Sequence, residues 1–137
     1  YENFSNFQIK SLIYLCKKLK NKYKIDRENF LGHSDIAPFR KNDPGEKFSW
    51  KKMSEFGIGT WYKLNKKKLL LNKTKLKISF FKNLYIIGYR YFKITKRAKK
   101  DQKIILAFQR RYMPRAITGK IDQKTMKISQ FLANNKN

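Results

Sequence analysis

The chain's only histidine, His33, lies ten residues before Asp43, and Lys41 lies two residues before that carboxylate. A neutral imidazole and a carboxylate are both good ligands for Zn²⁺. A lysine ammonium beside them is suited to stabilise an oxyanion that forms on a metal-bound carbonyl. The same spacing also fits an ordinary loop histidine, an aspartate in a turn and a solvated lysine. The three residues therefore indicate a candidate metal site, and the spacing alone leaves both interpretations open.

The rest of the chain offers few other groups for metal chemistry. It contains one cysteine, Cys16, which excludes an intrachain disulfide and a cysteine-based zinc site. Cys16 falls on the apolar face of the first predicted helix, so we expect a small buried hydrophobic residue there. Any metal site must therefore depend on His33 and on oxygen ligands.

The segments around His33 must position these residues. A capping-box pattern at residues 5–8, followed by apolar residues three and four apart, predicts a helix that ends near Tyr23. Residues 30–32 are expected to form a buried strand. An irregular stretch with two prolines then covers residues 33–47. A short amphipathic helix is expected over residues 48–56.

The C-terminal part of the chain has a different pattern. Residues 76–137 contain three apolar stripes at helical spacing, of which the first ends at Gly88 and the second at Pro114. Asp122 is in position to cap the third helix. The lysine-rich segment 63–75 is expected to connect this small helical bundle to the first part of the chain.

Charge is the most unusual feature of the composition. The 137 residues include 34 Lys and Arg against 9 Asp and Glu, a formal net charge of +25, which suggests a polyanionic partner. However, 27 of the basic residues are lysines spread over every segment, as compositional drift in an A- and T-rich gene would also produce. The aromatic residues fall on apolar stripes, so we expect no nucleic-acid partner. No apolar run of about 18 residues predicts a transmembrane segment.

The region around His33 is more specific as a string of residues. Gly32-His33, Ser34 to Pro38 and Arg40 to Gly45 follow one another in this order. Together they closely resemble the signature of the type-2 N-acetylmuramoyl-L-alanine amidases, in the AmiD branch of the AmpD-like zinc amidases. The resemblance continues through Phe48-Ser49-Trp50 and the turn from Gly57 to Trp61.

The C-terminal part resembles the peptidoglycan-binding module of the same family, at residues 85–89, 107–115 and 119–125. The resemblance implies an α/β fold, with a truncated mixed sheet and flanking helices, followed by a small all-α three-helix bundle. It implies three parts: the C-terminal portion of a zinc amidase domain at residues 1–62, a connector at residues 63–75, and a peptidoglycan-binding-like domain at residues 76–137.

The same resemblance implies roles for individual residues. His33 and Asp43 would be zinc ligands, Lys41 would assist catalysis by stabilising the tetrahedral intermediate, and Arg40 is a candidate for substrate binding. The family's second zinc-binding histidine and its general-base glutamate are absent from this chain. We therefore expect an N-terminally truncated part of an amidase that is inactive alone.

The activity that the resemblance implies is zinc-dependent hydrolysis of the amide between N-acetylmuramic acid and the L-Ala of the peptidoglycan stem peptide. The expected partners are peptidoglycan or muropeptides. A module that binds peptidoglycan or another anionic polymer without catalysis is the alternative. The expected compartment is the periplasm or the outer membrane, with cytoplasmic muropeptide recycling as the alternative.

Overall fold

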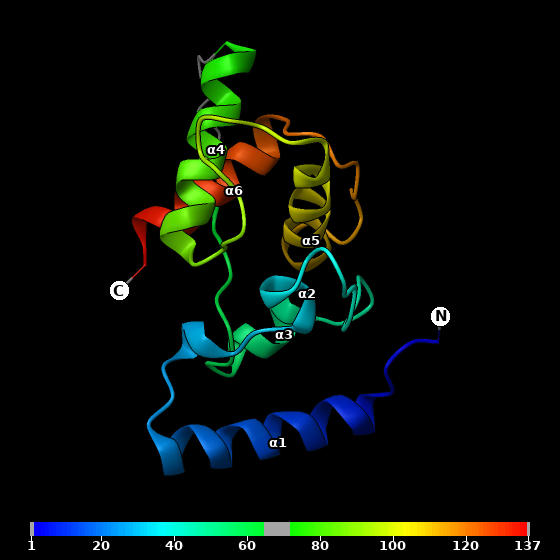
Figure 1. The fold of residues 1–137 in the computed structure, drawn as a ribbon. Coiled ribbons are helices and arrows are strands. Elements are labelled where there is room, and N and C mark those ends of the chain that lie inside the picture. The colour runs from blue at the N-terminus through cyan, green and yellow to red at the C-terminus, as the bar shows by residue number, and fades with distance from the viewer. Residues whose placement is uncertain (1, 65–71, 137) are drawn as a thin grey trace.

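The computed structural model describes residues 2–64 and 72–136. In these ranges, the α-helices are α1 (Asn6–Tyr23), α2 (His33–Ile36), α3 (Trp50–Glu55), α4 (Lys73–Ile87), α5 (Gln102–Tyr112) and α6 (Gln123–Asn134), with short 3-10 helices η1 (Arg27–Asn29) and η2 (Lys99–Asp101). Helix α1 lies along the bottom of the view in Figure 1, and α4, α5 and α6 lie at the top. The short helices α2 and α3 lie between them, so the segment that carries His33 is at the centre of the molecule.

Helix α1 begins as the sequence predicts. The Ser5 N–H donates to Gln8 Oε1 at 2.7 Å, and the Gln8 N–H donates to Ser5 Oγ at 3.1 Å. These two bonds satisfy amides at the helix start that have no partner within the helix. Helix α1 ends at Tyr23, also as predicted. Its buried residues are Ile9 and Ile13, which pack against the apolar side chains of α3.

The three helices predicted in the C-terminal part are present as α4, α5 and α6. Their apolar stripes share one core, in which Phe80 and Phe108 are fully buried. The two rings pack edge to face, with their centroids 5.3 Å apart. The Asp122 carboxylate accepts the Thr125 N–H at 2.7 Å and so caps α6. Periodicity and capping, both local signals, thus suffice to predict this region.

The predicted α/β fold with a mixed sheet is wrong for the described residues, because residues 2–64 and 72–136 contain no strand. Residues 30–32 are extended but have no neighbouring strand. Their backbone groups bond to side chains instead: the Phe30 carbonyl accepts from Arg111, and the Gly32 N–H donates to Asp35. A strand needs a partner for its ladder of hydrogen bonds, and this segment pairs with side chains.

The two predicted domains are in contact, and their boundaries stay a prediction. Residues 65–71 of the predicted connector lie outside the described residues, and residues 73–75 form the first turn of α4. From the first part of the chain, Phe39 and Trp61 pack against the core of α4, α5 and α6. The Lys103 ammonium also donates to the Phe39 carbonyl at 3.3 Å. The loop after α2 therefore rests directly on the C-terminal helices.

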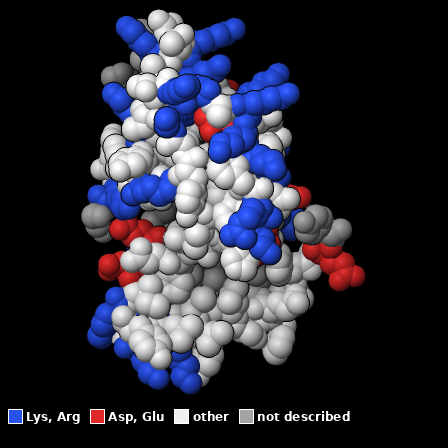
Figure 2. Space-filling model, in the orientation of Figure 1, with Lys and Arg blue, Asp and Glu red and all other residues white. Residues whose placement is uncertain are grey.

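The basic residues are spread over the surface, as expected from the sequence. In Figure 2 they occur both over the upper helices and at the lower edge of the molecule. On this face they lie over more than one element. Within the described part of the chain, no helix has both the length and the apolar character needed to cross a membrane.

Candidate metal centre

A closed loop between α2 and α3 brings His33 and Asp43 together. The Ser34 N–H donates to the Asp43 carbonyl at 3.0 Å, which ties the start of α2 to the residue ten positions after His33. A Cβ atom at Gly32 would lie 2.6 Å from Cδ of Pro44, closer than real Cβ atoms approach their neighbours. Glycine before the histidine therefore allows the two ends of the loop to meet.

The side chains of the pair are in contact and open to solvent. His33 Nδ1 lies 2.6 Å from Asp43 Oδ2, with side chains 69% and 56% exposed. Desolvation acts to raise the pKa of Asp43, but the hydrogen bond with His33 and the nearby charge of Lys41 hold it below its ordinary value. The carboxylate is therefore ionised at neutral pH, as a metal ligand must be.

The donor chemistry fits part of a zinc site. A histidine nitrogen and a carboxylate oxygen are both common zinc ligands, and here two such atoms lie 2.6 Å apart at the surface. Catalytic zinc usually has three protein ligands. Within residues 2–64 and 72–136, no group of three or more His, Cys, Asp or Glu side chains is placed to hold a metal ion. His33 and Asp43 thus form an incomplete set of ligands.

Lys41 and Arg40 lie on the same loop. Their backbone N–H groups both donate to the Ala37 carbonyl, at 2.9 and 3.0 Å, so the turn before Asp43 is fixed by the backbone. Both side chains are exposed. The charge of Lys41 is close enough to lower the pKa of Asp43. The structure thus brings Lys41 to the His33–Asp43 pair, while the roles of Lys41 and Arg40 stay predictions.

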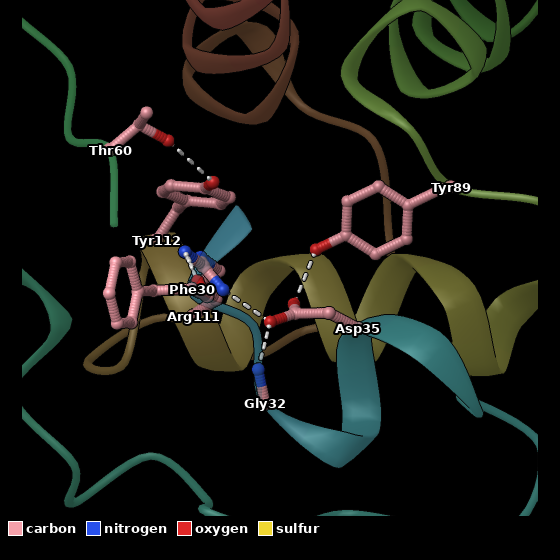
Figure 3. A network of polar contacts seen from close by, with 7 residues as sticks. All are labelled: Phe30, Gly32, Asp35, Thr60, Tyr89, Arg111 and Tyr112. Atoms are coloured by element: carbon pink, nitrogen blue, oxygen red, sulfur yellow. Dashed lines mark hydrogen bonds and ion pairs between the residues drawn. The ribbon is translucent and has the colours of Figure 1, made fainter. Parts of the chain in front are cut away.

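A buried carboxylate holds the base of this loop, and the sequence analysis did not identify it. Figure 3 shows Asp35, in α2, surrounded by donors from three other positions. Asp35 Oδ2 accepts the Gly32 N–H at 2.9 Å and pairs with the Arg111 guanidinium. Asp35 Oδ1 accepts the Tyr89 hydroxyl at 2.8 Å. We call Asp35, Tyr89 and Arg111 the Asp35 network.

Arg111 is the residue of this network whose burial is least expected from its place in the sequence. An exposed face of α5 is the simplest expectation for a run of arginines, with binding of an anionic polymer as the alternative. The side chain of Arg111 is instead 3% exposed. It lies over the ring of Trp50 at 3.7 Å and donates to the Phe30 carbonyl at 3.1 Å. Burial alone would lower the pKa of Arg111, but Tyr112 and Asp35 raise it, so the guanidinium stays charged.

Helical spacing contained a signal for this burial. Arg111 follows the buried residues Ile104 and Phe108 at intervals of seven and three positions, which places it on the same stripe of α5. Tyr89 follows the end of α4 and is also buried. Burial, and then the charge of Asp35, raise the pKa of Tyr89 well above its ordinary value, so its hydroxyl stays protonated as a donor.

A cavity of about 520 Å³ is lined in part by the three residues of the Asp35 network. Its lining includes five aromatic residues, Trp61, Tyr89, Tyr91, Tyr112 and Phe131, but neither His33 nor Asp43. Helix α6 supplies a further part of the wall. The described residues thus contain a solvent-exposed His33–Asp43 pair, named below the metal pair for its predicted role, and a separate, partly apolar cavity.

Known proteins are similar to this chain in sequence and in fold. Residues 1–46 match the family described as N-acetylmuramoyl-L-alanine amidase. The N-acetylmuramoyl-L-alanine amidase AmiD of Escherichia coli is 32% identical over 134 residues, which is 94% of this chain and 48% of AmiD. The 1,6-anhydro-N-acetylmuramyl-L-alanine amidase AmpD of Enterobacter cloacae is 40% identical over 47 residues, which is 34% of this chain and 25% of AmpD.

Two solved structures have a similar fold. A complex of E. coli AmiD with the substrate anhydro-N-acetylmuramic acid-L-Ala-D-gamma-Glu-L-Lys aligns with a TM-score of 0.82 at 30% identity, over 96% of this chain and 53% of that one. AMPDH3 from Pseudomonas aeruginosa, in complex with anhydromuramic pentapeptide, aligns with a TM-score of 0.81 at 27% identity, over 98% of this chain and 55% of that one. The chain thus spans about half the length of AmiD.

Proposed function

Because this chain is related to the N-acetylmuramoyl-L-alanine amidases AmiD and AmpD, we propose that it supplies part of a zinc site for the hydrolysis of muropeptides. The observation that carries the proposal is the 2.6 Å approach of His33 Nδ1 to Asp43 Oδ2, within residues that match the amidase family. The substrates named for the AmiD and AMPDH3 complexes, both anhydromuramic peptides, support this class of substrate.

In this proposal, His33 binds Zn²⁺ through its imidazole and Asp43 binds it through a carboxylate oxygen. Bound zinc supplies Lewis-acid chemistry, which polarises a carbonyl and lowers the pKa of water. The hydrogen bonds of the α2 loop orient both ligands before a metal arrives. The Lys41 ammonium places a positive charge where the substrate carbonyl oxygen becomes negative. Arg40 is exposed on the same loop and offers a partner for carboxylates of the stem peptide.

The reaction that these groups serve is hydrolysis of the amide between N-acetylmuramic acid and L-Ala. Water adds to the lactyl carbonyl carbon, the C–N bond breaks, and the nitrogen leaves as the amine of L-Ala.

Peptidoglycan lies outside the cytoplasmic membrane, so we propose a periplasmic or outer-membrane location, with cytoplasmic muropeptide recycling as the alternative.

Zinc titration of the 137-residue chain tests the metal pair. We expect His33→Asn and Asp43→Asn each to weaken zinc binding by about tenfold or more, because each removes one of two donors. The matched control is Glu46→Gln, which removes a carboxylate from the same loop but not from the pair. The proposal fails if zinc binds equally well to the unchanged chain and to His33→Asn.

Turnover by the chain alone is expected to be absent, because the described residues offer two zinc ligands where catalysis usually uses three. The test is incubation with zinc and an anhydromuropeptide, with the released peptide detected by mass spectrometry. Turnover that depends on His33 would show that the site is more complete than its described donors indicate.

A second candidate function is binding of peptidoglycan without catalysis. The observation that favours it is the cavity whose lining includes Trp61 and Tyr91, because aromatic rings offer apolar faces on which sugar rings stack. Pull-down with insoluble peptidoglycan separates the two functions. Binding that persists in His33→Asn and without zinc would support a binding module.

A further inference from the structure

Arg111 bridges the two ends of the segment that carries His33. One guanidinium nitrogen, Nη1, pairs with the Asp35 carboxylate, two residues after His33. The other, Nη2, donates to the Phe30 carbonyl at 3.1 Å, three residues before His33. A guanidinium is planar and rigid, so its two donors fix the distance between their acceptors. Arg111 comes from α5, far from this segment in the sequence (Figure 3).

Tyr89 holds the other oxygen of the same carboxylate. Its hydroxyl donates to Asp35 Oδ1 at 2.8 Å, and its pKa is raised so that this proton is retained. The carboxylate is therefore held at both oxygens by the C-terminal region and at Oδ2 by the Gly32 N–H. These contacts leave Asp35 little freedom to change rotamer.

The restraint passes from Asp35 to both members of the metal pair through the backbone. Asp35 and His33 lie on the same short helix, α2. The Ser34 N–H, between them, donates to the Asp43 carbonyl at 3.0 Å. A displacement of α2 would therefore move His33 relative to Asp43 and break this bond.

We propose that Arg111 and Tyr89 are positioning residues for the metal pair, so that the C-terminal helices orient His33 and Asp43 through Asp35. For zinc, the inference rests on the proposed function. Residues that orient metal ligands without touching the metal strongly affect metal affinity, since their loss typically weakens metal binding 10- to 100-fold. The C-terminal region thus contributes to the metal site as well as to any binding of the cell wall.

Two conservative variants test the proposal in the 137-residue chain. Tyr89→Phe removes one hydroxyl and keeps the ring in the core. Arg111→Lys keeps the charge but loses the two-pronged donor that reaches Asp35 and Phe30 together. In both, we expect hydrogen exchange of the Ser34 amide to accelerate about tenfold relative to core amides of α5, because its bond to Asp43 opens more often. The imidazole ¹⁵N shifts of His33 should change as well, and zinc affinity should fall about tenfold.

The matched control is Tyr112→Phe. It removes another buried tyrosine hydroxyl from the same core, one that lies 3.3 Å from Thr60 Oγ1. A general loss of stability would affect Tyr112→Phe and Tyr89→Phe alike, whereas positioning would affect the Ser34 amide and the His33 ring only in Tyr89→Phe. If Arg111→Lys does not fold, Tyr89→Phe decides the question alone.

The proposal is overturned if, in folded Tyr89→Phe, the Ser34 amide exchanges within about twofold of its rate in the unchanged chain and the ¹⁵N shifts of His33 do not change. This failure differs from failure of the proposed function. The latter appears as an absence of zinc binding in the unchanged chain, whereas Ser34 exchange and the His33 shifts report on positioning without a metal.

Discussion

The two regions of the molecule bury their apolar residues in different ways. In α4, α5 and α6, the stripes face one shared core, and Phe80 and Phe108 are 0% exposed. Helix α1 buries Ile9 and Ile13 but leaves Phe7 79% and Tyr14 66% exposed. The first region has a smaller core, in which Met53 and Ile58 are buried, and the Asp35 network also joins its central segment to the second region. The candidate metal loop is thus held in part by a region that carries none of its predicted ligands.

The largest expected effect comes from removing Phe108. Truncation to alanine opens a cavity against Phe80 and Tyr112 and should lower the free energy of unfolding by about 3–5 kcal/mol. Tyr14→Ala, on exposed α1, should change it by about 0.5 kcal/mol or less. Urea unfolding followed by circular dichroism measures both. Equal effects would break the contrast between the two regions.

Gly32→Ala tests the first region directly. The new Cβ would lie 2.6 Å from Cδ of Pro44, so the loop must shift, at a cost of about 1–3 kcal/mol. We expect weaker zinc binding than in the unchanged chain, because the shift separates His33 from Asp43. Normal stability together with unchanged zinc affinity would contradict the close packing of the loop.

Alkaline pH should weaken the contact between the regions through Tyr89. The folded pKa of Tyr89 lies well above its ordinary value of 10.0. Its contribution to the free energy of unfolding is therefore complete below about pH 10 and is lost as the pH rises from there through the folded pKa. Above about pH 10, stability should fall by up to about 1.4 kcal/mol per pH unit for this group. Urea unfolding as a function of pH measures the slope. Tyr89→Phe should remove this component, and an identical slope in the variant would exclude Tyr89 as its source.

Loss of the α1 cap should have the smallest effect. Ser5→Ala removes the acceptor for the Gln8 N–H and should cost about 1 kcal/mol. Hydrogen exchange should accelerate in the first turn of α1 and stay unchanged in α5. A matching change in α5 would show that the two regions are more tightly coupled through α1 than their burial indicates.

The sequence predicted what neighbouring residues determine. The Ser5 and Asp122 caps and the stripes of α4 to α6 depend on contacts a few positions apart, and the structure confirms them. The prediction of a strand at residues 30–32 was wrong, because a strand forms only beside a partner strand, which no local pattern specifies. The meeting of His33 with Asp43 agrees with the resemblance to a family, while their role as zinc ligands stays a prediction.

The Asp35 network shows why contacts between distant residues could not be predicted from the sequence. Asp35 and Arg111 lie 76 positions apart, and each has an ordinary local explanation, as a residue in a turn and as a charged residue on a helix. Only the packing of α5 against α2 makes them partners. A buried charge on the stripe of α5 was the available signal, because burial of an arginine requires an acidic or carbonyl partner elsewhere.

The Arg111–Asp35 pair also restricts how this protein can diverge. Both side chains are almost fully buried, so a change at one leaves the other charged in an apolar setting. Exchange of either half with that of a relative would therefore succeed only if the incoming half brought the matching residue. The two halves must be inherited as a compatible set, although each looks like a separate module in the linear sequence.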